Sequence, residues 1–163
     1  MSAAGIGRLL TATLHQAISE LLSTRLSFYE PWLTSDGVRM ARVSLAGVRA
    51  ALSFLRQEPD AYHPVLRRAG ELAAAWVWRD LSSMRRAVLQ AMPVWVRARS
   101  AVSLARRLAA DTWLETDATV RWRRGTGTLT VHPSLFCEVR GTVSAPLCTY
   151  YVAAWRHFSG NWG

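Results

Sequence analysis

The sequence predicts an α+β fold that is mainly helical, with a β-hairpin and a closing helix toward the C-terminus. Two patterns predict this class. Up to residue 110, apolar side chains recur every three or four positions, as they do in helices that bury one face. Further along, β-branched residues alternate with other residues on both sides of a glycine-rich turn, and helical spacing then returns.

Five helices are expected before the hairpin. They cover residues 6–24, 45–57, 64–81, 83–92 and 94–110. Residues 28–37 include Pro31 and the turn-forming sequence Ser35-Asp36-Gly37, so we expect a turn there, followed by a short extended segment over residues 38–43. Pro59 should end the second helix, because proline lacks an amide hydrogen and disfavours helix in the residue before it. The third helix should begin near Pro64, since proline suits a first helical turn.

The hairpin is expected to join strands 118–124 and 128–132 through the turn Gly125-Thr126-Gly127. Residues 133–144 lack a regular pattern, residues 145–158 form the closing helix, and residues 159–163 form a tail. A chain of 163 residues can bury one hydrophobic core. We therefore expect a single domain, in which residues 1–37 form an N-terminal helix and turn and residues 38–163 form the core.

Small and aromatic side chains are concentrated in the third helix. Ala69, Gly70 and the alanines at 73–75 would let another backbone or a ligand approach closely. Trp76 and Trp78 lie about 200° apart around a helix, so one should face the core and the other a partner, a pocket or solvent. Eight tryptophans in one short chain indicate aromatic packing in a core, at an interface or around a planar ligand.

The net charge of +9 comes with 20 basic residues, all of which are arginine. This skew is typical of coding bias in a GC-rich genome, and dedicated phosphate-binding surfaces usually mix arginine with lysine. We therefore do not expect nucleic acid as a partner. Arg97, Arg99, Arg106 and Arg107 are interpreted as a solvated helix face, with contact to a membrane surface as the alternative, because arginine combined with tryptophan suits lipid headgroups. No apolar run is long enough to span a membrane.

The residue types that catalyse reactions or bind metals show no spacing of a known catalytic or metal-binding motif. The four histidines (His15, His63, His132 and His157) are far apart, and two cysteines with one nearby carboxylate make an incomplete zinc site. Neither a nucleophile elbow nor a phosphate-binding loop is present. We expect no catalytic residue, no metal and no cofactor, and we lean toward a protein that is not an enzyme. With only Cys137 and Cys148, reduced thiols in the cytoplasm are the expected state.

Two segments together resemble a known family. The first spans residues 48–81 and includes the run from Val65 to Leu72 (VLRRAGEL); the second combines residues 134–137 (SLFC) with residues 145–151 (APLCTYY). They resemble the 4-vinyl reductase domain family, which is related to the small subunits of the TRAPP tethering complex. The resemblance implies an α/β sandwich that dimerises through helices and holds a small hydrophobic molecule in an internal pocket. Many members carry an acidic residue and two further cysteines that complete a zinc site, which this chain lacks.

The pocket is expected between residues 69–78 and 148–155, with the hairpin as its floor. Its predicted lining residues are Leu66, Gly70, Trp76, Phe136, Cys148, Tyr151 and Trp155. The predicted function is a non-enzymatic sensor or carrier for a small hydrophobic molecule, acting as a homodimer. The alternatives are a ligand-free interaction subunit, an enzyme acting on a tetrapyrrole-like or aromatic substrate, and a nucleic-acid-binding protein. Replacing Gly70 with leucine should abolish ligand retention and leave the fold intact.

Overall fold

The structure is a computed structural model that describes residues 7–33, 45–113, 115–123, 126–137 and 147–160. The described elements are α1 (Arg8–Leu21), a 3-10 turn (Ser23–Arg25), α2 (Leu26–Leu33), α4 (Leu45–Arg56), α5 (Pro59–Asp80), α6 (Ser83–Ala91), α7 (Val94–Thr112), β1 (Asp117–Arg123), β2 (Thr126–His132) and α8 (Thr149–Gly160). The mainly helical α+β class predicted from the sequence is confirmed. The strands pair antiparallel, with Asp117 opposite His132 and Arg123 opposite Thr126.

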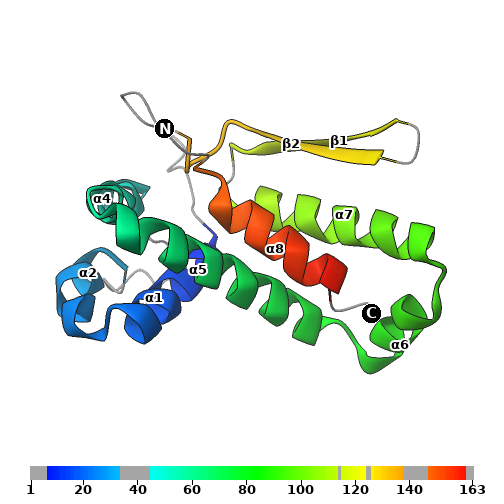
Figure 1. The fold of residues 1–163 in the computed structure, drawn as a ribbon, viewed down its shortest axis with the longest axis horizontal. Coiled ribbons are helices and arrows are strands. Elements are labelled where there is room, and N and C mark those ends of the chain that lie inside the picture. Colours follow the sequence, from blue (N-terminus) through cyan, green and yellow to red (C-terminus); the bar gives the residue numbers. More distant parts are fainter. Residues whose placement is uncertain (1–6, 34–44, 114, 124–125, 138–146, 161–163) are drawn as a thin grey trace.

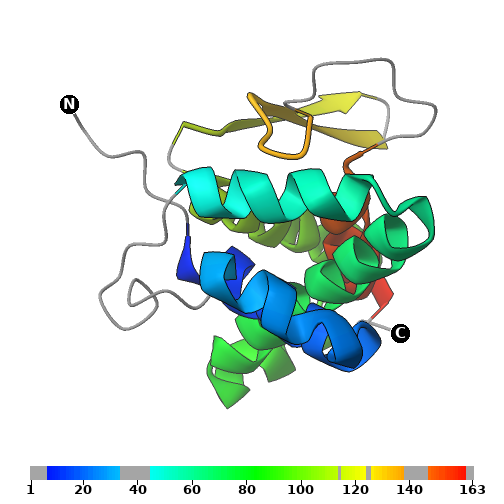
Figure 2. The ribbon, with the colours of Figure 1, turned by 90° about the vertical axis from the view of Figure 1, so that its left-hand side faces the viewer.

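Helix α5 is the centre of the molecule. It packs against α1, α4, α7 and α8, while the β-hairpin lies over α7 on one side of the helices (Figures 1 and 2). Helix α1 contributes Leu10, Leu14, Ala17 and Ile18 to the core, and all four are fully buried. The N-terminal helix is therefore part of the same core as the segments that follow it.

Two prolines lie inside helices, where the sequence predicted boundaries. Residues 28–33 continue helix α2 through Pro31 instead of forming a turn, and α5 begins at Pro59 and continues through Pro64. An internal proline removes one helical hydrogen bond and costs about 3 kcal/mol. Burial of Leu33 in α2 and of Val65 in α5 offsets this cost, because their helical positions direct these side chains into the core. The expected extended segment at residues 38–43 lies outside the described residues.

Glycines allow two pairs of helices to approach more closely than any side chain would permit. A β-carbon at Gly70 of α5 would collide with the carbonyl oxygen of Tyr150 in α8 and lie 3.1 Å from the β-carbon of Ala153. A β-carbon at Gly7 would collide with the carbonyl oxygen of Asp111 at the end of α7, while the Gly7 amide donates a hydrogen bond to the Thr112 carbonyl, at 3.1 Å. The expectation that a leucine at position 70 leaves the fold intact is therefore wrong.

We expect Gly70→Ala to lower the free energy of unfolding by about 2 to 3 kcal/mol, because the methyl group would force α5 and α8 apart. Gly160→Ala is the matched control: a β-carbon there meets nothing within 4 Å, so stability should change by less than about 0.5 kcal/mol. Urea denaturation followed by circular dichroism measures both. Equal stabilities for the two variants would contradict this account of the α5–α8 contact.

Candidate binding groove and adjacent dithiol

The predicted lining residues lie in three places. Phe136, Cys148 and Tyr151 gather at the start of α8, where the Phe136 and Tyr151 rings meet edge to face with centroids 5.3 Å apart. Leu66 and Gly70 are buried between α5 and its neighbours, Trp155 is half-buried against the core, and Trp76 is half-buried further along α5. At Gly70 the backbones of α5 and α8 are in direct contact, so the two helices fill the space expected for an internal pocket there.

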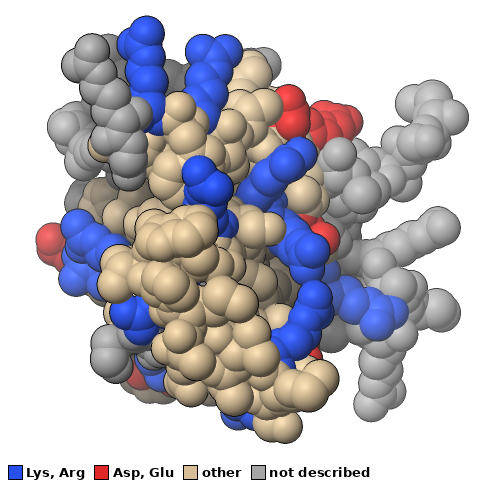
Figure 3. All heavy atoms as spheres, turned by 90° about the vertical axis from the view of Figure 1, so that its right-hand side faces the viewer, with Lys and Arg blue, Asp and Glu red and all other residues tan. Residues whose placement is uncertain are grey.

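One of the two neighbouring tryptophans, Trp76 and Trp78, was expected to face the core. Trp78 packs against it. Trp113 is fully buried, whereas Trp95 and Trp122 are exposed. The arginines at 99, 106 and 107 are exposed, as a solvated helix face requires, and Arg97 is half-buried. Figure 3 shows the end of the molecule formed by α6, the start of α7 and the hairpin, where arginines surround uncharged side chains.

A groove of about 660 Å³ runs along the outer side of the α5–α8 pair. Its lining residues, which define the α5–α8 groove, are His63, Arg67, Glu71, Thr149, Val152, Ala153, Arg156, His157 and Gly160. The three residues from α5 are spaced four apart and so share one helix face, and those from α8 follow helical spacing as well. The volume is in the range of small-molecule sites.

The cationic side chains of the groove are available to a ligand. Among the described residues, neither Arg67 nor Arg156 forms an ion pair, and both are exposed. His63 Nδ1 lies 2.9 Å from the Thr149 hydroxyl, which links the second turn of α5 to the first residue of α8. Val152 and Ala153 supply an apolar side to the same groove. The groove therefore combines guanidinium groups with apolar surface.

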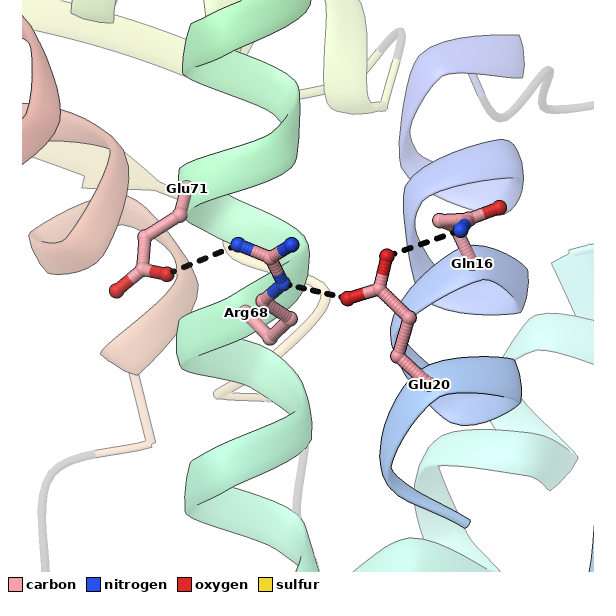
Figure 4. A network of polar contacts seen from close by, with 4 residues as sticks. All are labelled: Gln16, Glu20, Arg68 and Glu71. Carbon is pink, nitrogen blue, oxygen red and sulfur yellow. Dashed lines mark hydrogen bonds and ion pairs between the residues drawn. The ribbon is translucent and has the colours of Figure 1, made fainter. Parts of the chain in front are cut away.

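The single carboxylate in the groove is engaged by a network that ties α1 to α5 (Figure 4). Arg68 lies 3.7 Å from Glu71 and donates a 2.6 Å hydrogen bond to Glu20, which also accepts one from Gln16 at 2.9 Å. The hydrogen bond from Arg68 holds the pKa of Glu20 below its ordinary value. Arg68 is shared between Glu20 and Glu71, but the groove lining itself carries two arginines and one carboxylate, so an anion there meets a net positive surface.

Sequence reasoning did not find this groove. It treated the four histidines as unrelated, yet the packing of α5 on α8 brings His63 and His157 to one surface. The repeat of His63, Arg67 and Glu71 at four-residue spacing was the available signal. The sequence did place the closing helix beside this segment, but it put the ligand between the two helices and not along the face that carries His63 and His157.

A pair of thiols, the dithiol, lies beside the groove. The sulfurs of Cys137 and Cys148 are 3.1 Å apart, and Cys148 directly precedes Thr149 of the groove. Burial, and after it the contact with Cys137, raise the pKa of Cys148 to about 12. Cys148 is therefore protonated at neutral pH, and Cys137 is the exposed thiol of the pair.

Two side chains hold the residues that precede the cysteines. Arg56, the last residue of α4, donates a 3.0 Å hydrogen bond to the carbonyl of Phe136, and the Tyr62 hydroxyl of α5 donates one of 3.3 Å to the carbonyl of Leu147. Arg56 also lies over the Tyr62 ring, 6.0 Å from its centroid. The end of α4 and the start of α5 thus position both sulfurs, although the two cysteines are eleven positions apart along the chain.

Metal binding has limited support in this geometry. In the parts of the chain that the structure describes, no three His, Cys, Asp or Glu side chains lie together as a metal site requires. The dithiol alone offers two ligands. Its geometry suits thiol–disulfide chemistry better, because the two sulfurs already face each other.

We expect oxidised glutathione to close a disulfide between Cys137 and Cys148 in the wild type. The glutathione disulfide accepts two electrons, and the two thiol protons leave with two glutathione molecules. The Cys148→Ser variant should instead keep a glutathione adduct on Cys137, and Cys137→Ser should stay unmodified at neutral pH because its remaining thiol is protonated. Intact-mass spectrometry distinguishes the three products. A lasting glutathione adduct on the wild type would contradict the observed sulfur geometry.

Comparisons with known proteins do not assign the chain to a family: no family model, no curated protein and no solved structure matches it. The resemblance to the 4-vinyl reductase family, and the α/β sandwich it implies, therefore stay predictions.

Proposed function

We propose that this chain is a non-enzymatic binding module, a sensor or carrier, for a small amphipathic organic acid seated in the α5–α8 groove. One observation carries the proposal. In the groove, Arg67 and Arg156, which form no ion pair with any described residue, lie beside an apolar side formed by Val152 and Ala153. Guanidinium groups bind carboxylates through two parallel hydrogen bonds, which suits recognition of an acidic head.

The proposed ligand differs in one respect from the wholly hydrophobic molecule expected from the sequence. The contact at Gly70 closes the space between α5 and α8, so the ligand is placed on the outer side of the same helix pair. There its apolar part can cover Val152, which is 46 % exposed, while its acidic head meets the arginines. The cytoplasm remains the proposed location, because two cysteines are too few for the disulfide framework of a secreted domain.

A decanoate titration tests this proposal. We expect the wild type to bind decanoate more tightly than decanol, and the double variant Arg67→Gln/Arg156→Gln to bind decanoate about tenfold more weakly, because charge-assisted hydrogen bonds are lost. Isothermal titration calorimetry gives the dissociation constants. Arg79→Gln, which removes an exposed arginine of α5 outside the groove, is the control and should bind like the wild type.

Two results would reject the groove as the ligand site. One is equal affinity of the wild type for decanoate and decanol; the other is an equal loss of affinity in Arg79→Gln and in the double variant. Native mass spectrometry of freshly purified protein, compared with a denaturing spectrum, would then show whether any ligand of other chemistry is carried.

An interaction subunit is the second candidate, and an exposed aromatic cluster on α2 and α4 favours it. Trp32 and Phe54 stack with ring centroids 4.9 Å apart, and Phe28 meets Phe54 edge to face at 5.2 Å. Phe28 is 50 % exposed. Aromatic groups on a surface are enriched at protein interfaces, and a second copy of the chain is the proposed partner.

We expect a homodimer formed through this cluster to dissociate in the Phe54→Glu variant, because the glutamate would be buried without a partner in the interface. Light scattering after size-exclusion chromatography measures the molar mass over a range of concentrations. The control Val152→Glu changes a similarly exposed apolar residue on α8 and should keep the mass of the wild type. A wild type that is monomeric throughout would reject this interface.

A further inference from the structure

Helices α6 and α7 meet in an exposed apolar segment, the apolar corner, formed by residues 91–96 (Ala-Met-Pro-Val-Trp-Val). Five of its six residues are exposed and the sixth, Val96, is half-buried; Val94 is 70 % exposed and Trp95 64 %. Figure 1 shows the α6–α7 connection at the outer edge of the molecule. A run of exposed apolar residues this long has an unfavourable hydration free energy and marks a surface that another phase or partner covers.

Helix α6 extends this apolar surface. None of its residues is buried, and Met84 is 74 % exposed. Between α6 and α7 lies a hollow of about 290 Å³. Its lining residues are Leu81, Met84, Arg85, Val88, Leu89, Ser100, Ser103, Leu104 and Arg107. Apolar side chains therefore continue from the corner into the hollow, with arginines at its margins.

The charge of this region has one sign. Residues 81–110 contain six arginines and no aspartate or glutamate, so their formal charge is +6. The six are Arg85, Arg86, Arg97, Arg99, Arg106 and Arg107. Arg99 lies between two aromatic rings, 5.7 Å from the centroid of Trp95 and 5.8 Å from that of Trp122, so the hairpin joins the same surface. Figure 3 shows uncharged side chains with arginines around them at this end of the molecule, together with a few acidic side chains from outside residues 81–110.

We propose that the apolar corner and α6 dock onto the surface of an anionic lipid bilayer. In this arrangement Val94 and Trp95 enter the headgroup–acyl boundary, while the flanking arginines contact lipid phosphates. Tryptophan combines an apolar ring with a polar N–H and suits this boundary, and arginine side chains keep their charged ends at the phosphates. Adsorption of this kind needs no spanning helix, and none of the described helices is long and apolar enough to cross a membrane.

A bilayer fits these observations better than the other anionic partners. A nucleic acid would use the arginines, but phosphate contacts, which supply most of its affinity for a basic surface, would leave Val94 and Met84 exposed. An acidic peptide helix needs a groove for its apolar face, whereas the most exposed residues here lie on an outward-projecting corner. A fluid acyl boundary accepts projecting apolar groups without a matching shape.

Vesicle co-sedimentation of the full chain tests the proposal. The probes are phosphatidylcholine vesicles with and without about one third phosphatidylglycerol, at about 0.1 M salt. We expect the wild type to sediment with the mixed vesicles and to remain largely in solution with pure phosphatidylcholine. Val94→Asp should lower the partition coefficient at least about tenfold, because the corner could no longer enter the apolar boundary.

Leu21→Asp is the matched control, since Leu21 of α1 is 47 % exposed and its replacement changes the charge equally. This variant should bind vesicles within about twofold of the wild type. Circular dichroism verifies that both variants fold. Equal vesicle binding by Val94→Asp and Leu21→Asp would overturn the proposal, because it would show that binding depends on net charge alone and not on the apolar corner. A wild type that ignores the vesicles but binds a short DNA duplex would also overturn it and assign the surface to nucleic acid.

Discussion

The direct contact between Gly70 of α5 and the carbonyl of Tyr150 in α8 sets the position of most functional side chains. Because no β-carbon separates the helices, α8 lies along α5 with His63 beside Thr149. The same approach buries the Tyr150 ring completely and raises the pKa of its hydroxyl through burial. A wider separation would move Arg156 and His157 away from Arg67, so the α5–α8 groove depends on one missing side chain.

The groove and the dithiol are consequences of the same packing. Cys148 stands just before the first residue of α8, and its carbonyl accepts a 3.2 Å hydrogen bond from the Val152 amide. Arg56 and Tyr62 then hold the residues before each cysteine, which places the exposed Cys137 against the half-buried Cys148. A redox change at the dithiol would act one residue from Thr149, and therefore at the end of the proposed ligand site.

The molecule divides its exposed apolar residues between separate surfaces. The aromatic cluster lies on α2 and α4, the apolar corner lies between α6 and α7, and α5 and α8 separate them with the proposed ligand groove (Figure 1). The α6–α7 region combines apolar side chains with a formal charge of a single sign, which favours a lipid surface there and a protein partner at the aromatic cluster. The three proposed interactions use different residues and can be tested independently.

The sequence alone determined the helical class, the positions of α1, α4, α6 and α7, and the hairpin, because apolar spacing and β-branched alternation are local patterns that each element carries by itself. It misplaced the boundaries at Pro31 and Pro64, where burial of neighbouring side chains in the core outweighs the local preference of proline. It also singled out Gly70 as a place of close approach but assigned that space to a ligand. Only the tertiary structure decided that α8 fills it, and that His63 and His157, 94 positions apart, share one surface. The physical reason is that spacing reveals which face of a helix is apolar, whereas the partner of that face depends on the packing of all the helices together.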